Sequence, residues 1–390
     1  MKSGVFKRTA LVAALASSGV FAHADALPFS FYALIDAGVV STKVSGGAAG
    51  AGQTTEIRSS PIDPSFWGVI AEKKVGSLIG GLQLESTINV TNYTSGNTGG
   101  TPGAGANFGQ NTSPTTLADR QANVYVKTDA AGKFEIGTIT DPVFDALLKV
   151  DPTSSGFGNT LSPWFQFVGH SSDTGAMKYT SPTVSGFTGN FSYVAPKAAN
   201  TTQNGSNATY GSGLRYAITY TAGDLTAVAA YEQNNSNGST TVTAGTTQNT
   251  ATVFGASYKI DAFTIKAIAL INKDGVAANA DYGSIKTAGF GGSYDFSDKV
   301  QLTTGYYTSK DGGSTNNNGT SVSAWDSYVT YEFIKDLKVY GQYANVTDTG
   351  TAASKTFNFN SNYGTWANNG GLLSGQAAKV FSVGLHYGFF

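Results

Sequence analysis

Several stretches of the chain alternate apolar and polar residues with a period of two. Residues 225–231 place four apolar side chains on one face and Thr226 with Val228 on the other. Residues 300–306 and 337–343 alternate in the same way, with polar side chains facing away from leucine and valine. A period of two over segments of this length predicts β-strands that have one apolar and one polar face.

The connections between these strands alternate between short turns and long polar segments. Each short turn follows a strand that ends in tyrosine; the turns are 221–224, 260–262, 295–298 and 333–336, after Tyr220, Tyr258, Tyr294 and Tyr331. The long connections are rich in Asn, Gly, Ser and Thr and cover 95–111, 234–248, 311–320 and 347–376. This arrangement is typical of outer-membrane barrels, and tyrosines at the short-turn ends fit an aromatic girdle at the membrane interface.

We therefore predict an all-β protein, a transmembrane antiparallel β-barrel of about sixteen strands. The strands cover residues 29–40, 64–74, 77–92, 116–127, 132–140, 174–182, 187–195, 208–221, 224–234, 248–260, 263–272, 284–296, 299–309, 321–334, 337–347 and 377–389. Sixteen is an even number, as in bacterial single-chain barrels, and a barrel of that width encloses a water-filled lumen. The alternative is a soluble β-sandwich with core tyrosines, which the weak apolar content of the strands disfavours.

The first 24 residues have the features of a secretory signal peptide. Lys2, Lys7 and Arg8 precede a short apolar stretch, and residues 22–24 form an A-x-A cleavage site. Cleavage after Ala24 leaves residues 25–390 as the barrel domain and changes the formal charge from −1 to −4. The apolar stretch is too short for a membrane-spanning helix.

Composition excludes several classes of function. Charged residues are 13% of the chain, about half the roughly 25% of soluble domains, and there is no cysteine. Thiol chemistry and thiolate metal sites are therefore excluded, and the chain has no basic stripe for nucleic acid. His170 with Asp173 is weak evidence for a catalytic triad, and residues 311–319 lack the closing Glu of a calcium loop. We expect no catalytic residue, no metal and no cofactor.

Several motifs resemble Gram-negative general porins of the beta-proteobacterial type. The most specific is MKYTSPTVSGFTG; the others are SFYALIDAG, SFWGVI and GKFEIGTIT, and they lie at residues 177–189, 30–38, 65–70 and 132–140. The resemblance extends over the mature chain and is densest up to Tyr193. It implies a trimeric barrel of sixteen strands whose third long loop, here residues 141–173, folds inward and narrows the pore.

The resemblance also implies which charges line this constriction. Porins of this type place Arg or Lys on the inner wall opposite an acidic third loop. The wall cations that remain are Arg120 and Lys178, whereas Phe66, Ile70, Ile79 and Thr138 stand at positions that are basic in relatives. The loop supplies Asp141, Asp145, Asp151 and Asp173, although Asp-Pro pairs also favour turns. We therefore predict weak ion selectivity, neutral to mildly cation-preferring.

The last strand ends in an aromatic residue. Alternate positions from Phe381 to Phe389 are apolar, and one further phenylalanine, Phe390, follows. The resemblance implies that Phe389 or Phe390 is the signal for the barrel-assembly machinery.

The function predicted from these features is an outer-membrane porin for passive diffusion of small hydrophilic solutes and ions. The expected surroundings are outer-membrane lipid and lipopolysaccharide of a Gram-negative cell, and the expected assembly is a homotrimer. A substrate-specific channel and a surface adhesin that acts through its long loops remain as alternatives.

Overall fold

The computed structural model describes residues 29–46, 52–90, 94–95, 118–153, 171–196, 212–236, 247–273, 285–311, 321–349 and 375–389. The expected signal peptide (residues 1–24), Phe390, His170 and most of each long connection lie outside these residues.

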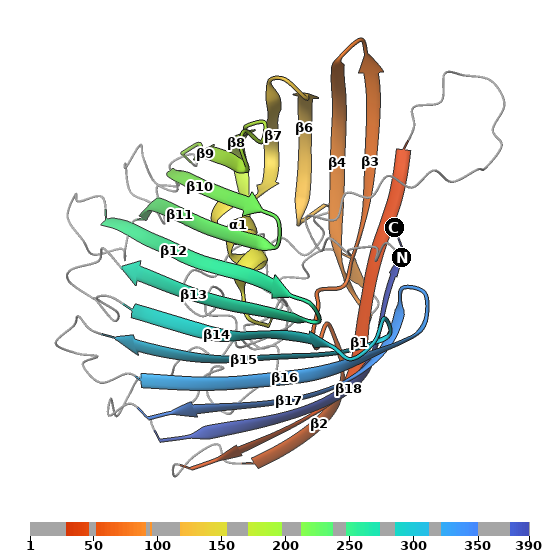
Figure 1. The fold of residues 1–390 in the computed structure, drawn as a ribbon, viewed down its shortest axis with the longest axis vertical. Helices are drawn as coiled ribbons and strands as arrows, with labels where there is room; N and C mark the ends of the chain where they lie inside the picture. The colour runs from red at the N-terminus through yellow and green to blue at the C-terminus, as the bar shows by residue number, and fades with distance from the viewer. Residues whose placement is uncertain are drawn as a thin grey trace.

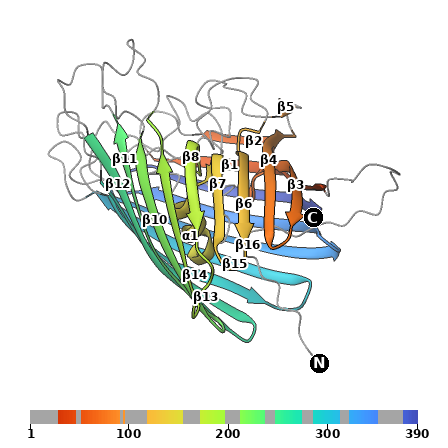
Figure 2. The same ribbon diagram turned by 90° about the horizontal axis from the view of Figure 1, so that it is seen from above.

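The described strands form a closed 16-strand antiparallel barrel (Figures 1 and 2). It closes where β1 (Phe29–Ser45) pairs with β18 (Ala377–Phe389), from Ala33↔Phe389 to Ser45↔Ala377. The other strands are β3 (Phe66–Val75), β4 (Leu78–Asn89), β6 (Gln121–Thr128), β7 (Gly132–Thr140), β8 (Ser172–Thr180), β9 (Phe187–Val194), β10 (Gly213–Ala222), β11 (Leu225–Ser236), β12 (Thr247–Ile260), β13 (Phe263–Lys273), β14 (Ile285–Asp295), β15 (Val300–Asp311), β16 (Ser321–Ile334) and β17 (Leu337–Asp348). Each overlaps a predicted strand, so the predicted architecture is confirmed. Closure matters because an unpaired backbone group in hydrocarbon costs several kcal/mol.

Two short strands were not predicted. β2 (Gly52–Ser59) pairs with the second half of β1, while β3 pairs with its first half, so β2 and β3 together border β1. Asp36 fixes the segment that connects β2 to β3, because its Oδ2 accepts the backbone N–H groups of Ile62 (2.7 Å) and Asp63 (2.8 Å). β5 (Thr94–Ser95) pairs only with the end of β4.

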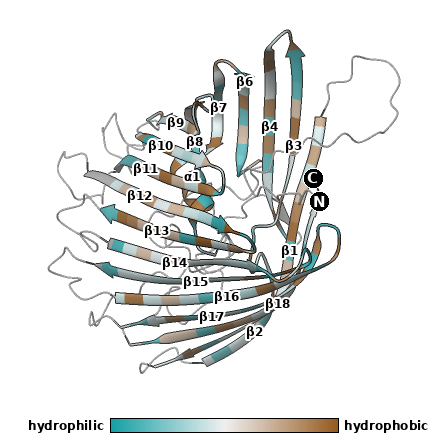
Figure 3. Ribbon diagram, viewed as in Figure 1, coloured by the Kyte–Doolittle hydropathy of each residue, from teal (hydrophilic) through white to brown (hydrophobic). Residues whose placement is uncertain are grey.

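Hydrophobic and hydrophilic residues alternate along many of the strands (Figure 3), and the burial of their side chains alternates between an outward face and a lumen face. In β18, Phe381 and Val383 are 60% and 67% exposed on the outward face, whereas Ser382 between them is 2% exposed. The predicted girdle tyrosines follow the outward pattern: the Tyr220 and Tyr294 rings pack on outward-facing Phe187 and Phe263 at centroid distances of 4.5 and 4.4 Å. The outward face is thus the apolar one, as a barrel in lipid requires.

Lumen-facing tyrosines lie flat against the barrel wall. Tyr32 and Tyr125 are cross-strand partners of Gly68 and Gly81, and a Cβ on either glycine would overlap the tyrosine ring. Because the partner has no side chain, each ring covers the wall without projecting into the lumen.

The described residues contain a single helix, α1 (Pro142–Val150), in the predicted third loop. It lies inside the barrel against β10 to β13 (Figures 1 and 2), so the described part of this loop folds inward. No helix among the described residues is long and apolar enough to cross a membrane.

Candidate functional site

The third loop enters the barrel as a helix with a well-defined start and end. Asp141 caps the N-terminus of α1, because its Oδ1 accepts the backbone N–H groups of Val143 (2.6 Å) and Phe144 (3.3 Å). Pro142 follows in the first turn, where its missing N–H leaves no hydrogen bond unmade. Asp151 ends the helix, since Pro152 disfavours helical backbone at the residue before it.

The helix is amphipathic, and its apolar face is turned to the barrel wall. The buried side chains are those of Pro142, Val143, Phe144, Ala146, Leu147 and Val150. Asp145, Leu148 and Lys149 are only partly buried, and their spacing of three and four residues places them on one face. Asp145 and Lys149 are therefore the charges that α1 presents to the pore.

Small lumen-facing residues on β10 to β12 form the floor beneath α1. The helix belongs to one buried cluster with Ala217, Val228, Ala230, Ala251 and Val253. Gly255 lies directly beneath the end of α1, since a Cβ there would lie 2.5 Å from Cγ2 of Val150. These small side chains let the helix lie close to the wall.

A buried arginine on β10 anchors the start of the loop. Arg215 is 2% exposed, and its Nη2 donates to Oδ1 of Asp173 at 2.8 Å, while its Nε lies 3.6 Å from Oδ2 of Asp141. The guanidinium also donates to Oδ1 of Asn234 (2.6 Å) and to the carbonyl of Gln233 (3.3 Å). One cation thus neutralises the two carboxylates that begin and end the third loop.

A second group of contacts anchors the end of α1. The Asp151 carboxylate accepts the hydroxyl of Tyr307, and Lys266 Nζ donates to the Asp151 carbonyl at 3.0 Å. Thr153 contacts the Tyr307 hydroxyl through its Oγ1 (3.0 Å), and its carbonyl accepts the hydroxyl of Tyr328 at 2.5 Å. Burial raises the pKa of the Asp151 carboxyl, whereas the Tyr307 hydrogen bond and the nearby Lys266 charge favour its ionised form. These contacts fix the loop to β13, β15 and β16.

The predicted loop aspartates therefore have different environments. Asp141, Asp151 and Asp173 are 0%, 0% and 5% exposed, and they cap the helix or pair with Arg215. Asp145 alone among the predicted aspartates lies on the pore side of α1. The loop consequently presents much less negative charge to the pore than the sequence suggested.

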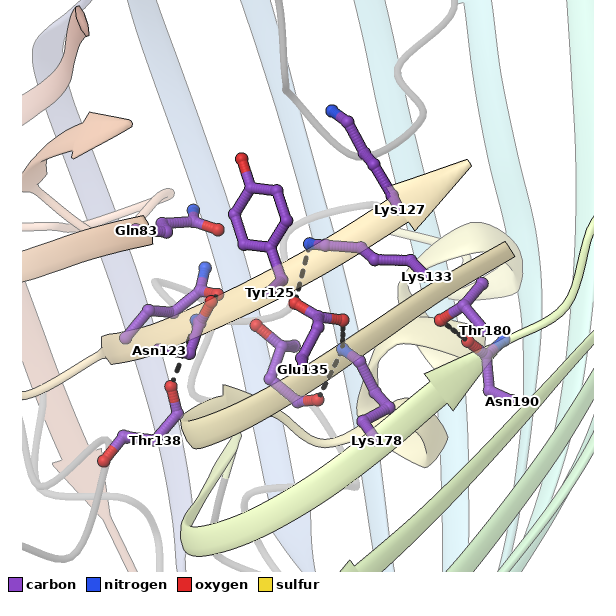
Figure 4. A network of polar contacts seen from close by, with 12 residues as sticks. Gln83, Asn123, Tyr125, Lys127, Lys133, Glu135, Thr138, Lys178, Thr180 and Asn190 are labelled. Carbon is purple, nitrogen blue, oxygen red and sulfur yellow. Dashed lines mark hydrogen bonds and ion pairs between the residues drawn. The ribbon is translucent and has the colours of Figure 1, made fainter. Parts of the chain in front are cut away.

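The lumen face of β3 to β9 carries many polar side chains, and Figure 4 shows some of them. Lys133 and Lys178 converge on Glu135, with nitrogen–oxygen distances of 2.6 and 3.3 Å. Lys127 pairs with Glu72 on β3 at 2.5 Å. Each of these lysines has a carboxylate partner, so the cations on this wall are largely neutralised.

The predicted wall residues Arg120 and Phe66 lie together. Arg120 Nε donates to Oε1 of Glu85 at 2.6 Å, and its guanidinium carbon lies 4.6 Å from the centre of the Phe66 ring. Tyr32 donates to the other oxygen of Glu85 at 2.8 Å. Ile70 shares the lumen face of β3 and is 8% exposed.

Lys178 and Thr138 lie on opposite faces of the sheet. Lys178 points to the lumen side, is 7% exposed and donates to the carbonyl of Thr140 at 3.2 Å. Thr138 pairs with Ala122 and is one position removed from lumen-facing Gly137, so it lies on the outward face of β7. The prediction that Thr138 lines the pore is therefore corrected.

Sequence reasoning missed the residues that hold the loop in place. Arg215, Lys266 and Tyr307 lie on strands that are distant in sequence from the loop, and no motif marks them. The scarcity of arginine could have pointed to Arg215. After residue 24 the chain has Arg58, Arg120 and Arg215, and each is in an ion pair on the lumen side.

The family model of Gram-negative porins matches residues 9–352. The chain belongs to this family. The porin is thus a passive outer-membrane channel, and the predicted family and function are confirmed. The sequence matches none of the curated proteins.

Solved structures of porins resemble this porin in fold. An anion-selective porin from Comamonas acidovorans is 18% identical, with a TM-score of 0.69, and the match covers 93% of this porin and 99% of that chain. OmpT of Vibrio cholerae in its trimer form is also 18% identical, with a TM-score of 0.59 and coverage of 93% and 99%. OmpF of Salmonella typhi in complex with daunomycin is 16% identical, with a TM-score of 0.59 and coverage of 93% and 97%.

Phe389 pairs with Ala33 at the barrel seam and is 39% exposed on the outward face. Phe390 lies outside the described residues, and the role of either phenylalanine in assembly stays a prediction.

Proposed function

We propose that this porin is a weakly selective channel for small hydrophilic solutes and ions, neutral to mildly cation-preferring. The observation that carries the proposal is that most described charges on the lumen wall, and those that anchor the third loop, are in ion pairs. Arg120 pairs with Glu85, Lys133 and Lys178 share Glu135, and Arg215 neutralises two loop carboxylates. A strongly selective pore needs unpaired charges of one sign at its narrowest point.

The passage that we propose runs between α1 and the polar wall of β3 to β8. Its loop side carries Asp145 and Lys149, which have opposite charges and lie one turn apart. Its wall side carries Arg120 over Phe66, where an aromatic surface adjoins a paired cation. Such a lining suits solutes that are neutral or partly apolar as well as small ions.

We further propose that residues 1–24 are removed on export and that the mature porin assembles as a homotrimer among outer-membrane lipid and lipopolysaccharide. The trimer form of the OmpT structure supports the assembly. A terminal phenylalanine, Phe389 or Phe390, serves as the assembly signal in this proposal.

Neutralising the two pore-side charges of α1 separately is expected to move ion selectivity in opposite directions. Asp145→Asn removes a negative charge and shifts the permeability ratio towards anions, and Lys149→Gln shifts it towards cations. Each shift is up to about five-fold, because a unit charge a few ångströms from an ion in water is worth about 1 kcal/mol. The measurement is the zero-current potential of the purified protein in a planar bilayer with a salt gradient.

Lys335→Gln is the matched control, because Lys335 lies exposed in a short turn far from α1 and carries the same charge as Lys149. If both α1 variants behave like this control, α1 does not border the ion path, and the proposed passage is wrong.

A further inference from the structure

The connection from β2 to β3 contains four more residues than continuous pairing with β1 needs. Ala37 of β1 pairs with Ser59, whereas Leu34 of β1 pairs with Phe66. Three steps along β1 therefore correspond to seven steps along the neighbouring chain, and the four extra residues leave the plane of the sheet. We call residues 60–65 the inner segment.

The inner segment covers the lumen face of the wall where the barrel closes. Asp36 of β1 and His386 of β18 are direct cross-strand partners on this face. The Asp36 carboxylate accepts the backbone N–H groups of Ile62 and Asp63 at 2.7 and 2.8 Å. The side chain of Asp63 reaches His386, with 3.4 Å between Oδ2 and Nδ1. The inner segment is thus held against lumen-facing side chains of both closing strands.

Hydrogen bonds at both ends hold the inner segment in one conformation. Ser60 donates its backbone N–H to the Asp36 carbonyl at 2.7 Å, and the Ser65 hydroxyl donates to the same carbonyl at 3.0 Å. The Ser60 hydroxyl accepts the backbone N–H of Ser65 at 2.8 Å, which closes the segment at its base. Ser60 has a left-handed backbone conformation (φ 62°), and Ile62 is 3% exposed. The inner segment is therefore a fixed part of the lumen wall.

The inner segment lies opposite α1 in the strand order of the barrel. The helix packs most closely on β11, with β10 and β12 on either side. From β11, eight steps lead through β12 and β18 to β1, and eight lead through β10 and β3 to β1. Figure 1 shows α1 and β1 on different sides of the barrel. The lumen is consequently narrowed by α1 on one side and by the inner segment on the other.

Asp63 is the carboxylate that the inner segment presents to the lumen. Its side chain is 34% exposed, whereas Asp36 beneath the segment is fully buried and His386 is 14% exposed. Three residues further along the chain, the Phe66 ring lies 4.6 Å from the guanidinium carbon of Arg120. Asp63 is therefore next to the part of the wall that borders the proposed passage.

His386 is placed to change the net charge beside Asp63. Histidine gains a proton between about pH 8 and about pH 5. The titratable groups that face it are Asp63 of the inner segment, Asp36 of β1, Lys338 and Tyr340 of β17 and, paired with Lys338 at 3.9 Å, Glu332 of β16. A proton on His386 offsets the charge of Asp63, so the pair changes from net negative to neutral as the pH falls.

We propose that the inner segment forms the side of the constriction opposite α1 and that Asp63 and His386 determine the ion selectivity there. At neutral and higher pH the Asp63 carboxylate favours cations, and at acidic pH protonated His386 cancels this preference. The inference rests on the proposed passage and adds to it a negative group across the lumen from Asp145.

The test is the zero-current potential of the purified porin in a planar bilayer with a salt gradient, at about pH 8 and about pH 5. We expect Asp63→Asn to shift the permeability ratio towards anions by up to about five-fold at the higher pH, because a lumen charge is lost. Asp298→Asn, in an exposed short turn, is the matched control and is expected to keep the native ratio. Equal ratios for the two variants at the higher pH overturn the proposal.

The pH dependence distinguishes the Asp63–His386 pair from a purely structural contact. We expect the native preference for cations to fall by up to about five-fold between the higher and the lower pH. His386→Gln is expected to remove most of this dependence. A native ratio that is the same at both pH values, or a His386→Gln variant that follows the native change, contradicts the role of the pair.

Deletion of residues 61–64 tests whether the inner segment narrows the passage. The deletion removes the four extra residues, and Asp36→Asn is added because the carboxylate loses two N–H donors. We expect a larger single-channel conductance than that of Asp36→Asn alone, and equal conductance overturns the steric part of the proposal. Asp63→Asn and His386→Gln keep the backbone hydrogen bonds of the segment, so they decide the proposal even when the deletion variant does not assemble.

Asp145→Asn, measured in the same experiment, separates this inference from the proposed passage. If Asp145→Asn shifts the permeability ratio and Asp63→Asn does not, the passage stands and the inner segment does not border it. If neither variant shifts the ratio, both the passage and the inference are wrong.

Discussion

Replacing Arg215 with methionine is expected to release the third loop from the barrel wall and to destabilise the porin by about 3–5 kcal/mol. The guanidinium is buried between Asp141 and Asp173, and its removal leaves two carboxylates without their cation in a site that excludes water. The start of the loop then loses the ion pairs that join it to β10. We expect a lower thermal unfolding temperature and a single-channel current that fluctuates between levels.

Lys338→Met is the matched control for Arg215→Met. Lys338 also pairs with a lumen carboxylate, Glu332, at 3.9 Å, but both side chains are about a quarter exposed (23% and 25%). Such a pair contributes about 1 kcal/mol at most. Adding Asp141→Asn and Asp173→Asn to Arg215→Met removes the two buried negative charges that Arg215 faces and is expected to restore much of the stability. Arg215 does not anchor the loop if Arg215→Met unfolds at the same temperature as Lys338→Met and its single-channel current is equally steady.

Replacing Gly255 with leucine is expected to push α1 away from the wall and to lower the single-channel conductance. Even a Cβ at this position would lie 2.5 Å from Cγ2 of Val150 and 2.9 Å from the carbonyl oxygen of Ala267, so the helix has to move towards the lumen. Overpacking of this kind costs about 1–3 kcal/mol, which an unfolding experiment will detect.

Gly80→Leu is the matched control, because Gly80 lies on the outward face of β4 with open space around it. We expect Gly80→Leu to leave the conductance unchanged. Equal conductance of the two variants would show that α1 does not rest on Gly255, or that its position does not set the width of the passage.

Most of the barrel was predictable because apolar and polar residues alternate along nearly every strand. Lipid on one side and a polar lumen on the other leave a period of two in segments such as Leu225–Ser236 and Ala377–Phe389. The helix α1 was not predicted, since a helix of 9 residues between two prolines carries little periodic signal. The interruption between β2 and β3 was missed for a different reason: it depends on the Asp36 carboxylate, which is distant in sequence.

The candidate site was predicted less completely than the fold. The positions of Arg120, Lys178 and Phe66 on the lumen face follow from strand register, which the sequence pattern specifies. Burial of the loop aspartates depends on partners such as Arg215 and Tyr307, and local sequence does not reveal such tertiary contacts. Thr138 was predicted on the wrong face, because the prediction followed the resemblance to relatives and not the alternation of β7, in which Phe134 and Ile136 face outward.

The zero-current potential of the native porin in a potassium chloride gradient tests the central claim most directly, with Phe66→Arg plus Ile70→Lys measured beside it. We expect a native potential close to zero with the sign of slight cation preference, because the wall cations are paired and Phe66 and Ile70 carry no charge. The double variant adds two cations to the lumen face of β3 and is expected to shift the potential clearly towards anion selectivity. A native potential that approaches the chloride equilibrium value, or a double variant with the native potential, would contradict a weakly selective pore whose lining includes β3.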